Sequence, residues 1–86
     1  MLDSLKALVG YLHDKHSQSE QDLSEVLEAA RKLARTESLN IMRGSISAFE
    51  YDYRINQIVR THHLKLRLKT RVLVSQEKFK QMLLAE

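Results

Sequence analysis

"FEYDYRINQIVRTHHLKLRLKTRVLV", residues 49–74, is the stretch that decides which fold this chain can adopt. Apolar residues hold every second position over 49–55. The alternation returns over 64–72, where Lys and Arg fill the positions between and one Thr stands in the apolar row. Successive side chains of a β-strand point to opposite faces, so this period of two separates an apolar face from a charged one. The pattern predicts two β-strands, over 47–59 and 62–74, joined as an antiparallel hairpin.

The charges between the apolar positions test this hairpin. A connection at Arg60–Thr61 places Glu50 opposite Arg71 and Asp52 opposite Lys69, and opposite charges across a strand pair stabilise it. The open end of the hairpin is then neutralised, and the positive charge remains near the turn. We expect a partner-binding surface at this basic hairpin tip, made by Arg54, Arg60, His62, His63, Lys65 and Arg67.

The rest of the chain is typical of amphipathic helices. Apolar residues at helical spacing predict one helix over 2–15 and a second over 18–36, with a connection between them. Ser75 in front of a short apolar series predicts an N-capped closing helix over 76–85. Residues 39–42 are read as a short extra strand or as the end of the second helix. The expected fold is therefore α+β, a single domain over 1–86 with the order helix, helix, β-hairpin, helix.

A second interpretation follows from the segment "KLARTESLNIMRGSISAFEYDYRIN", residues 32–56. It resembles the middle of type III secretion needle subunits, which have a KLA-like helix end and a later segment of the form S-x-L-S-x-Y…YRN. The resemblance implies an all-α helical hairpin that polymerises. The family's Pro-Ser-Asp-Pro-like turn is missing here, and the C-terminal part is more basic. The matching positions are Lys32, Leu33, Ala34, Ser47, Phe49, Tyr53, Arg54 and Asn56.

Composition narrows the classes of protein that remain. The chain has 86 residues, a formal net charge of +3 and no cysteine. The lack of cysteine excludes disulfides and thiolate zinc sites, and it fits a cytoplasmic protein. The apolar fraction of 43% is that of a globular domain. No secretory signal is evident at the start, and no run approaches the ~18 apolar residues of a membrane span.

Two groups of residues have side chains of the kind that carry chemistry. His13 and His16 are near neighbours on a helix, but two histidines without a third ligand predict surface residues and no metal site. Glu50 and Asp52 share one predicted strand face, where Arg71 and Lys69 would keep both ionised, so we interpret them as structural. No phosphate-binding glycine loop or nucleophile motif is present. We expect no enzyme activity, cofactor or small-molecule substrate.

The expected function is that of a non-enzymatic protein-protein interaction module: a small regulator, adaptor or assembly component. A lone two-stranded hairpin is marginally stable, so pairing of strand edges across a two-fold axis predicts a homodimer. Two alternatives stay open. One is a nucleic-acid-binding protein that uses the basic β-hairpin, and the other is a helical assembly subunit of the type III secretion needle kind.

Overall fold

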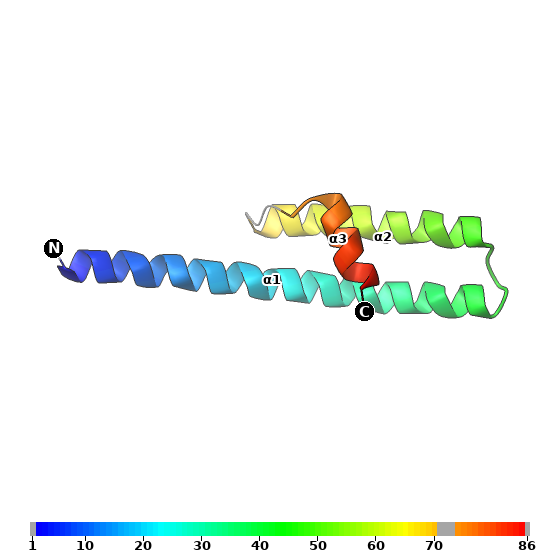
Figure 1. The fold of residues 1–86 in the computed structure, drawn as a ribbon, viewed down its shortest axis with the longest axis horizontal. Helices are drawn as coiled ribbons and strands as arrows, with labels where there is room; N and C mark the ends of the chain where they lie inside the picture. The colour runs from blue at the N-terminus through cyan, green and yellow to red at the C-terminus, as the bar shows by residue number, and fades with distance from the viewer. Residues whose placement is uncertain (1, 71–73, 86) are drawn as a thin grey trace.

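The computed structural model shows an all-helical rod. It describes the backbone of residues 2–70 and 74–85, and the side chains of these residues except 2–3 and 12–17. Helix α1 spans Leu2–Met42, α2 spans Ala48–Lys69 and α3 spans Gln76–Leu84. Helix α2 runs back antiparallel beside the C-terminal half of α1, and the short α3 crosses both (Figure 1). The molecule measures 65 × 17 × 16 Å.

The α+β prediction is wrong, because the described residues contain no strand. The predicted first strand, 47–59, lies in helix α2 apart from its first residue, and most of the second, 62–74, lies in the same helix, while 71–73 fall outside the described residues. The predicted extra strand at 39–42 is the last turn of α1. The all-α alternative has the correct class.

The alternation that suggested strands arises from two apolar rows on α2. Tyr51 and Ile55 are four residues apart and face the core, where Ile55 is 2% exposed. Phe49 and Tyr53 are also four residues apart, but both are exposed. Residues four apart lie on one side of a helix, so each row is helical by itself. The two rows are offset from each other by two residues, so together they place an apolar residue at every second position, as in a strand.

Helix α1 is continuous where two helices were predicted. No turn separates 2–15 from 18–36, because the connection expected between them contains no glycine or proline that would end a helix. Hydrogen bonds between side chains one turn apart support the helix just after the predicted break. Gln18 donates to Asp22 at 3.2 Å, and Gln21 donates to Glu25 at 3.4 Å.

The reversal between α1 and α2 is made by residues 43–47. Gly44 has φ +75°, a left-handed conformation that glycine adopts without a Cβ penalty. The N–H of Gly44 donates to the carbonyl of Ile41 at 3.1 Å, and the N–H of Ser45 donates to the carbonyl of Asn40 at 2.9 Å. This pair of bonds is a Schellman motif. Ser47 then caps α2 by accepting a hydrogen bond from the N–H of Glu50 at 3.1 Å.

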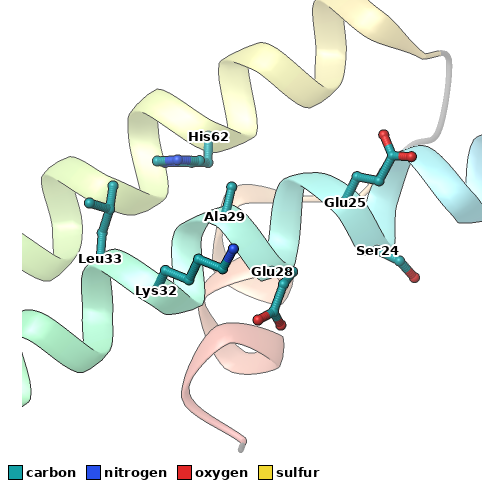
Figure 2. Close-up of a pocket in the computed structure, with 7 residues that line it drawn as sticks. All are labelled: Ser24, Glu25, Glu28, Ala29, Lys32, Leu33 and His62. Carbon is teal, nitrogen blue, oxygen red and sulfur yellow. The ribbon is translucent and has the colours of Figure 1, made fainter.

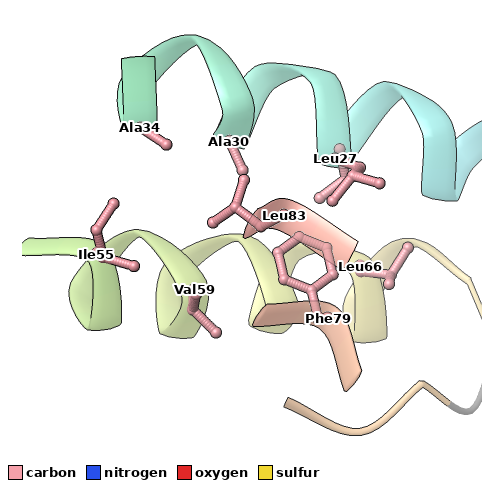
Figure 3. Packing of buried hydrophobic residues seen from close by; sticks show 9 residues of the cluster. Leu27, Ala30, Ala34, Ile55, Val59, Leu66, Phe79 and Leu83 are labelled. Carbon is pink, nitrogen blue, oxygen red and sulfur yellow. The ribbon is translucent and has the colours of Figure 1, made fainter. Parts of the chain in front are cut away.

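The core lies where the three helices meet. Helix α3 begins after Ser75, whose hydroxyl accepts from the N–H of Lys78 at 3.0 Å, and it covers nearly the same residues as the predicted helix over 76–85. Figure 3 shows Leu83 beside Ala30 of α1, where the small side chain leaves room for α3. The buried apolar residues that form this core are Val26, Leu27, Ala30, Ala34, Ile55, Val59, Leu66, Phe79 and Leu83.

Candidate protein-binding surface

The outer face of α2 carries four large apolar side chains in contact with solvent. Phe49 is 82% exposed and Tyr53 is 60% exposed, and they lie one turn apart near the start of the helix. Leu64 and Leu68 repeat this spacing near its end, at 55% and 81% exposure. Eleven residues, about three full turns, separate Tyr53 from Leu64, so the two pairs share one side of the helix. A single exposed leucine needs no explanation, but an aligned series of four does.

Two arginines belong to the same side of α2. Arg60 precedes Leu64 by four residues, and Arg67 follows Arg60 by two turns, so both lie along the line of the exposed apolar side chains. Both are exposed, and neither forms an ion pair with any residue that the structure describes. We call this surface the outer row. It consists of Phe49, Tyr53, Arg60, Leu64, Arg67 and Leu68.

The basic residues predicted at a hairpin tip are distributed along α2 instead. Arg60, Lys65 and Arg67 are exposed and have no acidic partner among the described residues. Arg54 lies near the other end of the helix, where it donates to Glu37 of α1 at 3.1 Å and lies 4.0 Å from Glu50. Among the described residues, three of the four predicted cations therefore have no acidic partner, whereas Arg54 is paired with α1 and leaves the group.

The two predicted histidines have structural contacts. His62 is 6% exposed, and its Nδ1 donates to the carbonyl of Ile58 at 2.8 Å. His63 is half-buried. Its Nε2 donates to the carbonyl of Val74, and its ring meets the edge of Phe79 with centroids 6.2 Å apart. His62 is buried and bonded within α2, and His63 joins α2 to the segment before α3 and to α3 itself, so neither is part of the outer row.

The charge pairs expected across a hairpin are replaced by pairs between helices. Lys69 does not contact Asp52. It donates to Glu25 of α1 at 3.2 Å and lies 3.6 Å from Asp22, and these contacts raise the pKa of Lys69, first through the hydrogen bond to Glu25. Asp52 accepts from Asn56 of its own helix at 3.4 Å. Arg71, the expected partner of Glu50, lies outside the described residues.

An open groove runs between α1 and α2. Figure 2 shows Ala29 and Leu33 of α1 pointing toward α2, near His62. The carboxylates at its rim are already paired, because Glu25 accepts from Lys69 and Glu28 accepts from Arg35 at 3.4 Å. The groove thus offers an apolar floor beside two paired carboxylates and the exposed Lys32, and we assign no chemistry to it.

The described residues also offer no metal site and no membrane-spanning helix. They contain no group of three His, Cys, Asp or Glu side chains that could hold a metal ion, while the side chains of His13 and His16 lie outside them. Within the described part of the chain, no helix has the length and apolar character needed to cross a bilayer. The outer row is therefore the surface with the strongest physical reason to bind something.

Sequence reasoning missed the apolar members of the outer row, because the strand interpretation buried all four of them. The signal that identifies them is the spacing of four residues within each pair, read separately from the core pair Tyr51 and Ile55. Comparison with protein-family models, curated proteins and solved structures finds no match for the chain. The resemblance to needle subunits gains no support from these comparisons.

Proposed function

We propose that this chain is a non-enzymatic protein-binding module whose outer row receives an amphipathic helix with acidic flanks. The observation that carries the proposal is the exposure of Phe49, Tyr53, Leu64 and Leu68 along one side of α2. An amphipathic helix docks by laying its apolar side chains along such a row at intervals of three, four and seven residues. Burying these side chains removes apolar surface from water, which is the main driving force of association.

The charge of the outer row selects the kind of helix. The second half of α2, residues 58–69, contains Arg60, Lys65, Arg67 and Lys69 and no acidic residue. Lys69 is paired with α1, so the other three cations set the local field. Acidic side chains on the partner would complement this field, speed association and make binding weaker at high salt.

A second candidate, binding of nucleic acid, is favoured by one observation. Phe49 and Tyr53 are exposed on the same side of α2 as Arg60 and Arg67, and exposed aromatic rings next to arginines can stack on bases. Two acidic residues, Glu50 and Asp52, lie in the same turn as the aromatic rings, however, and they repel phosphates. The arginines are instead close to leucines. This separation favours a protein partner.

Capture with matched variants tests the proposal. The full chain is immobilised as wild type, as Leu64→Ala/Leu68→Ala in the outer row, and as the control Leu39→Ala/Met42→Ala. The control also removes two exposed apolar side chains, but from α1, where Leu39 is 48% and Met42 81% exposed. Retained proteins are identified after nuclease treatment, and the main one is purified and titrated against all three chains.

We expect the outer-row variant to bind the purified partner at least about tenfold more weakly than the wild type does. Truncation of two leucines that are buried in an interface costs more than ~1.4 kcal/mol of binding free energy. The control variant should bind like the wild type. Equal affinity for all three chains would contradict the proposal. Retention that disappears with nuclease, together with direct binding of a duplex DNA probe that the outer-row variant loses, would favour nucleic acid.

A further inference from the structure

We infer that the N-terminal part of α1 is a homodimerisation surface, on which the same segment of a second copy packs antiparallel. This surface is separate from the outer row and goes beyond the proposed function. Helix α2 ends beside α1 at Lys69, which lies 3.6 Å from Asp22, and its last turn shares a shallow pocket with Gln18 and Ser19. Figure 1 shows α1 continuing alone beyond this point. We call residues 2–17 the overhang.

The overhang has an apolar stripe in line with the core. Eighteen residues make five full turns of an α-helix, so residues 18 apart lie on the same side. Leu8 is therefore in line with Val26, which is 7% exposed in the core, and Val9 is in line with Leu27, which is 6% exposed. The third such pair is Leu5 with Leu23, a residue packed against the core.

The corresponding side chains of the overhang lack this cover. Leu5 is 59%, Leu8 53% and Val9 63% exposed, although the helix presents them on the side that α2 covers further along. The apolar series continues in the sequence at Leu2 and Leu12. The apolar stripe of α1 that packs against α2 thus continues past the end of α2. A further helix on the same line would cover the rest of this stripe.

Three features select a second copy as that helix. The overhang contains Asp3, Lys6, Asp14 and Lys15, so its formal charge is balanced and two copies do not repel. An antiparallel copy has the direction of α2 and continues its line along α1. It also brings the positive end of its α1 dipole toward the negative end of α2.

The described part of the overhang gives the extent of the contact between two copies. Its 16 residues correspond to about 24 Å of helix. In an antiparallel pair, each overhang spans the other and stops where the partner's α2 ends, so Leu5, Leu8 and Val9 of both copies are covered. A two-fold axis through the middle of the overhang makes the two contacts identical and closes the assembly at a dimer.

Sedimentation equilibrium of the full chain over low to high micromolar concentration tests the dimer. The stripe variant is Leu5→Glu/Val9→Glu, and the matched control is Ala7→Glu/Gly10→Glu on the opposite side of α1. Ala7 is exposed, and a side chain added at Gly10 meets nothing within 4 Å. Because all four positions are exposed, both variants should keep the wild-type helix content.

We expect the wild type and the control to double their mass as concentration rises, and the stripe variant to need at least about ten times more protein to do so. A wild type that stays monomeric throughout, or equal weakening by both variants, would overturn the inference. So would a dimer that Leu64→Ala/Leu68→Ala abolishes, because self-association would then run through the outer row. The capture experiment tests partner binding by the outer row separately, so its result does not depend on whether the chain dimerises.

The direction of the pair is tested by cross-linking, since the chain has no cysteine of its own. Single cysteines replace Leu5, Leu8 and Val9 in turn, and the disulfide-linked dimer is measured after mild oxidation. An antiparallel pair brings only the position nearest the two-fold axis close to its own copy, so the yield should peak at Val9, next to the middle of the overhang, and be lowest at Leu5. Equal yields at all three positions would show a parallel pair and overturn the antiparallel arrangement.

Discussion

Three leucines of α2, spaced two residues apart, give a matched test of the helical account. A strand would place Leu64, Leu66 and Leu68 on one face in equal environments. The structure instead buries Leu66 completely, at 0% exposure, and leaves Leu64 at 55% and Leu68 at 81%. We therefore predict that the same substitution, Leu to Ala, has very different effects on stability at the three positions.

The magnitudes follow from burial. Truncating a fully buried leucine removes its transfer free energy and leaves a cavity, so Leu66→Ala should cost about 2–5 kcal/mol. Full burial of a leucine is worth about 1.5–3 kcal/mol, of which Leu64 and Leu68 realise less than half. Alanine also has the better helix propensity, which offsets part of that loss. Each of these two variants should therefore lose less than about 1 kcal/mol.

Denaturation followed by far-UV circular dichroism, at low protein concentration, measures these differences. A domain of this size shifts its Tm by about 4–8 °C per kcal/mol, so Leu66→Ala should melt at least ~10 °C lower than the wild type. Leu64→Ala and Leu68→Ala should stay within a few degrees. The denaturant m value should not change, because all variants unfold from the same compact state. Equal destabilisation at all three positions would refute the assignment of faces.

Three further predictions concern the ends of the helices. The raised pKa of Lys69 means that the wild type should be more stable than Lys69→Met at neutral pH. This difference in the free energy of unfolding is complete below the ordinary lysine pKa of 10.5 and disappears as the pH rises through the raised pKa of Lys69. Denaturant titrations of both chains across alkaline pH will measure it. Gly44→Ala should cost about 1–2 kcal/mol, because the residue keeps a positive φ, and an unchanged denaturation midpoint would contradict this. Ser47→Ala should cost about 0.5–2 kcal/mol through loss of the α2 cap, with Ser45→Ala as the neutral control.

The sequence indicated some elements correctly because their signals are local. Ser75 marks the start of α3, and the apolar stripe of α1 is evident at helical spacing. Helix α2 was not predictable in this way, because its two apolar rows interleave and only contact with α1 and α3 decides which row is buried. Ile55 and Tyr53 look equally suited to a core, and the difference in their exposure is tertiary.

The candidate surface shows the same limit. Arg60, Lys65 and Arg67 were expected to be exposed without acidic partners, and among the described residues the structure places them so. The pairing of Arg54 with Glu37 depends on how α2 lies against α1, which no local pattern specifies. The apolar half of the outer row was hidden by the assumption that a large apolar side chain in a regular pattern belongs to a core.

Titration of the purified partner against Leu64→Ala/Leu68→Ala is the most direct test of the outer row as a binding surface. Both leucines contribute little to stability, so the variant should keep the far-UV spectrum and nearly the melting temperature of the wild type. The account predicts a Kd raised at least about tenfold, with Leu39→Ala/Met42→Ala unchanged. A Kd equal to that of the wild type in the folded outer-row variant would contradict it.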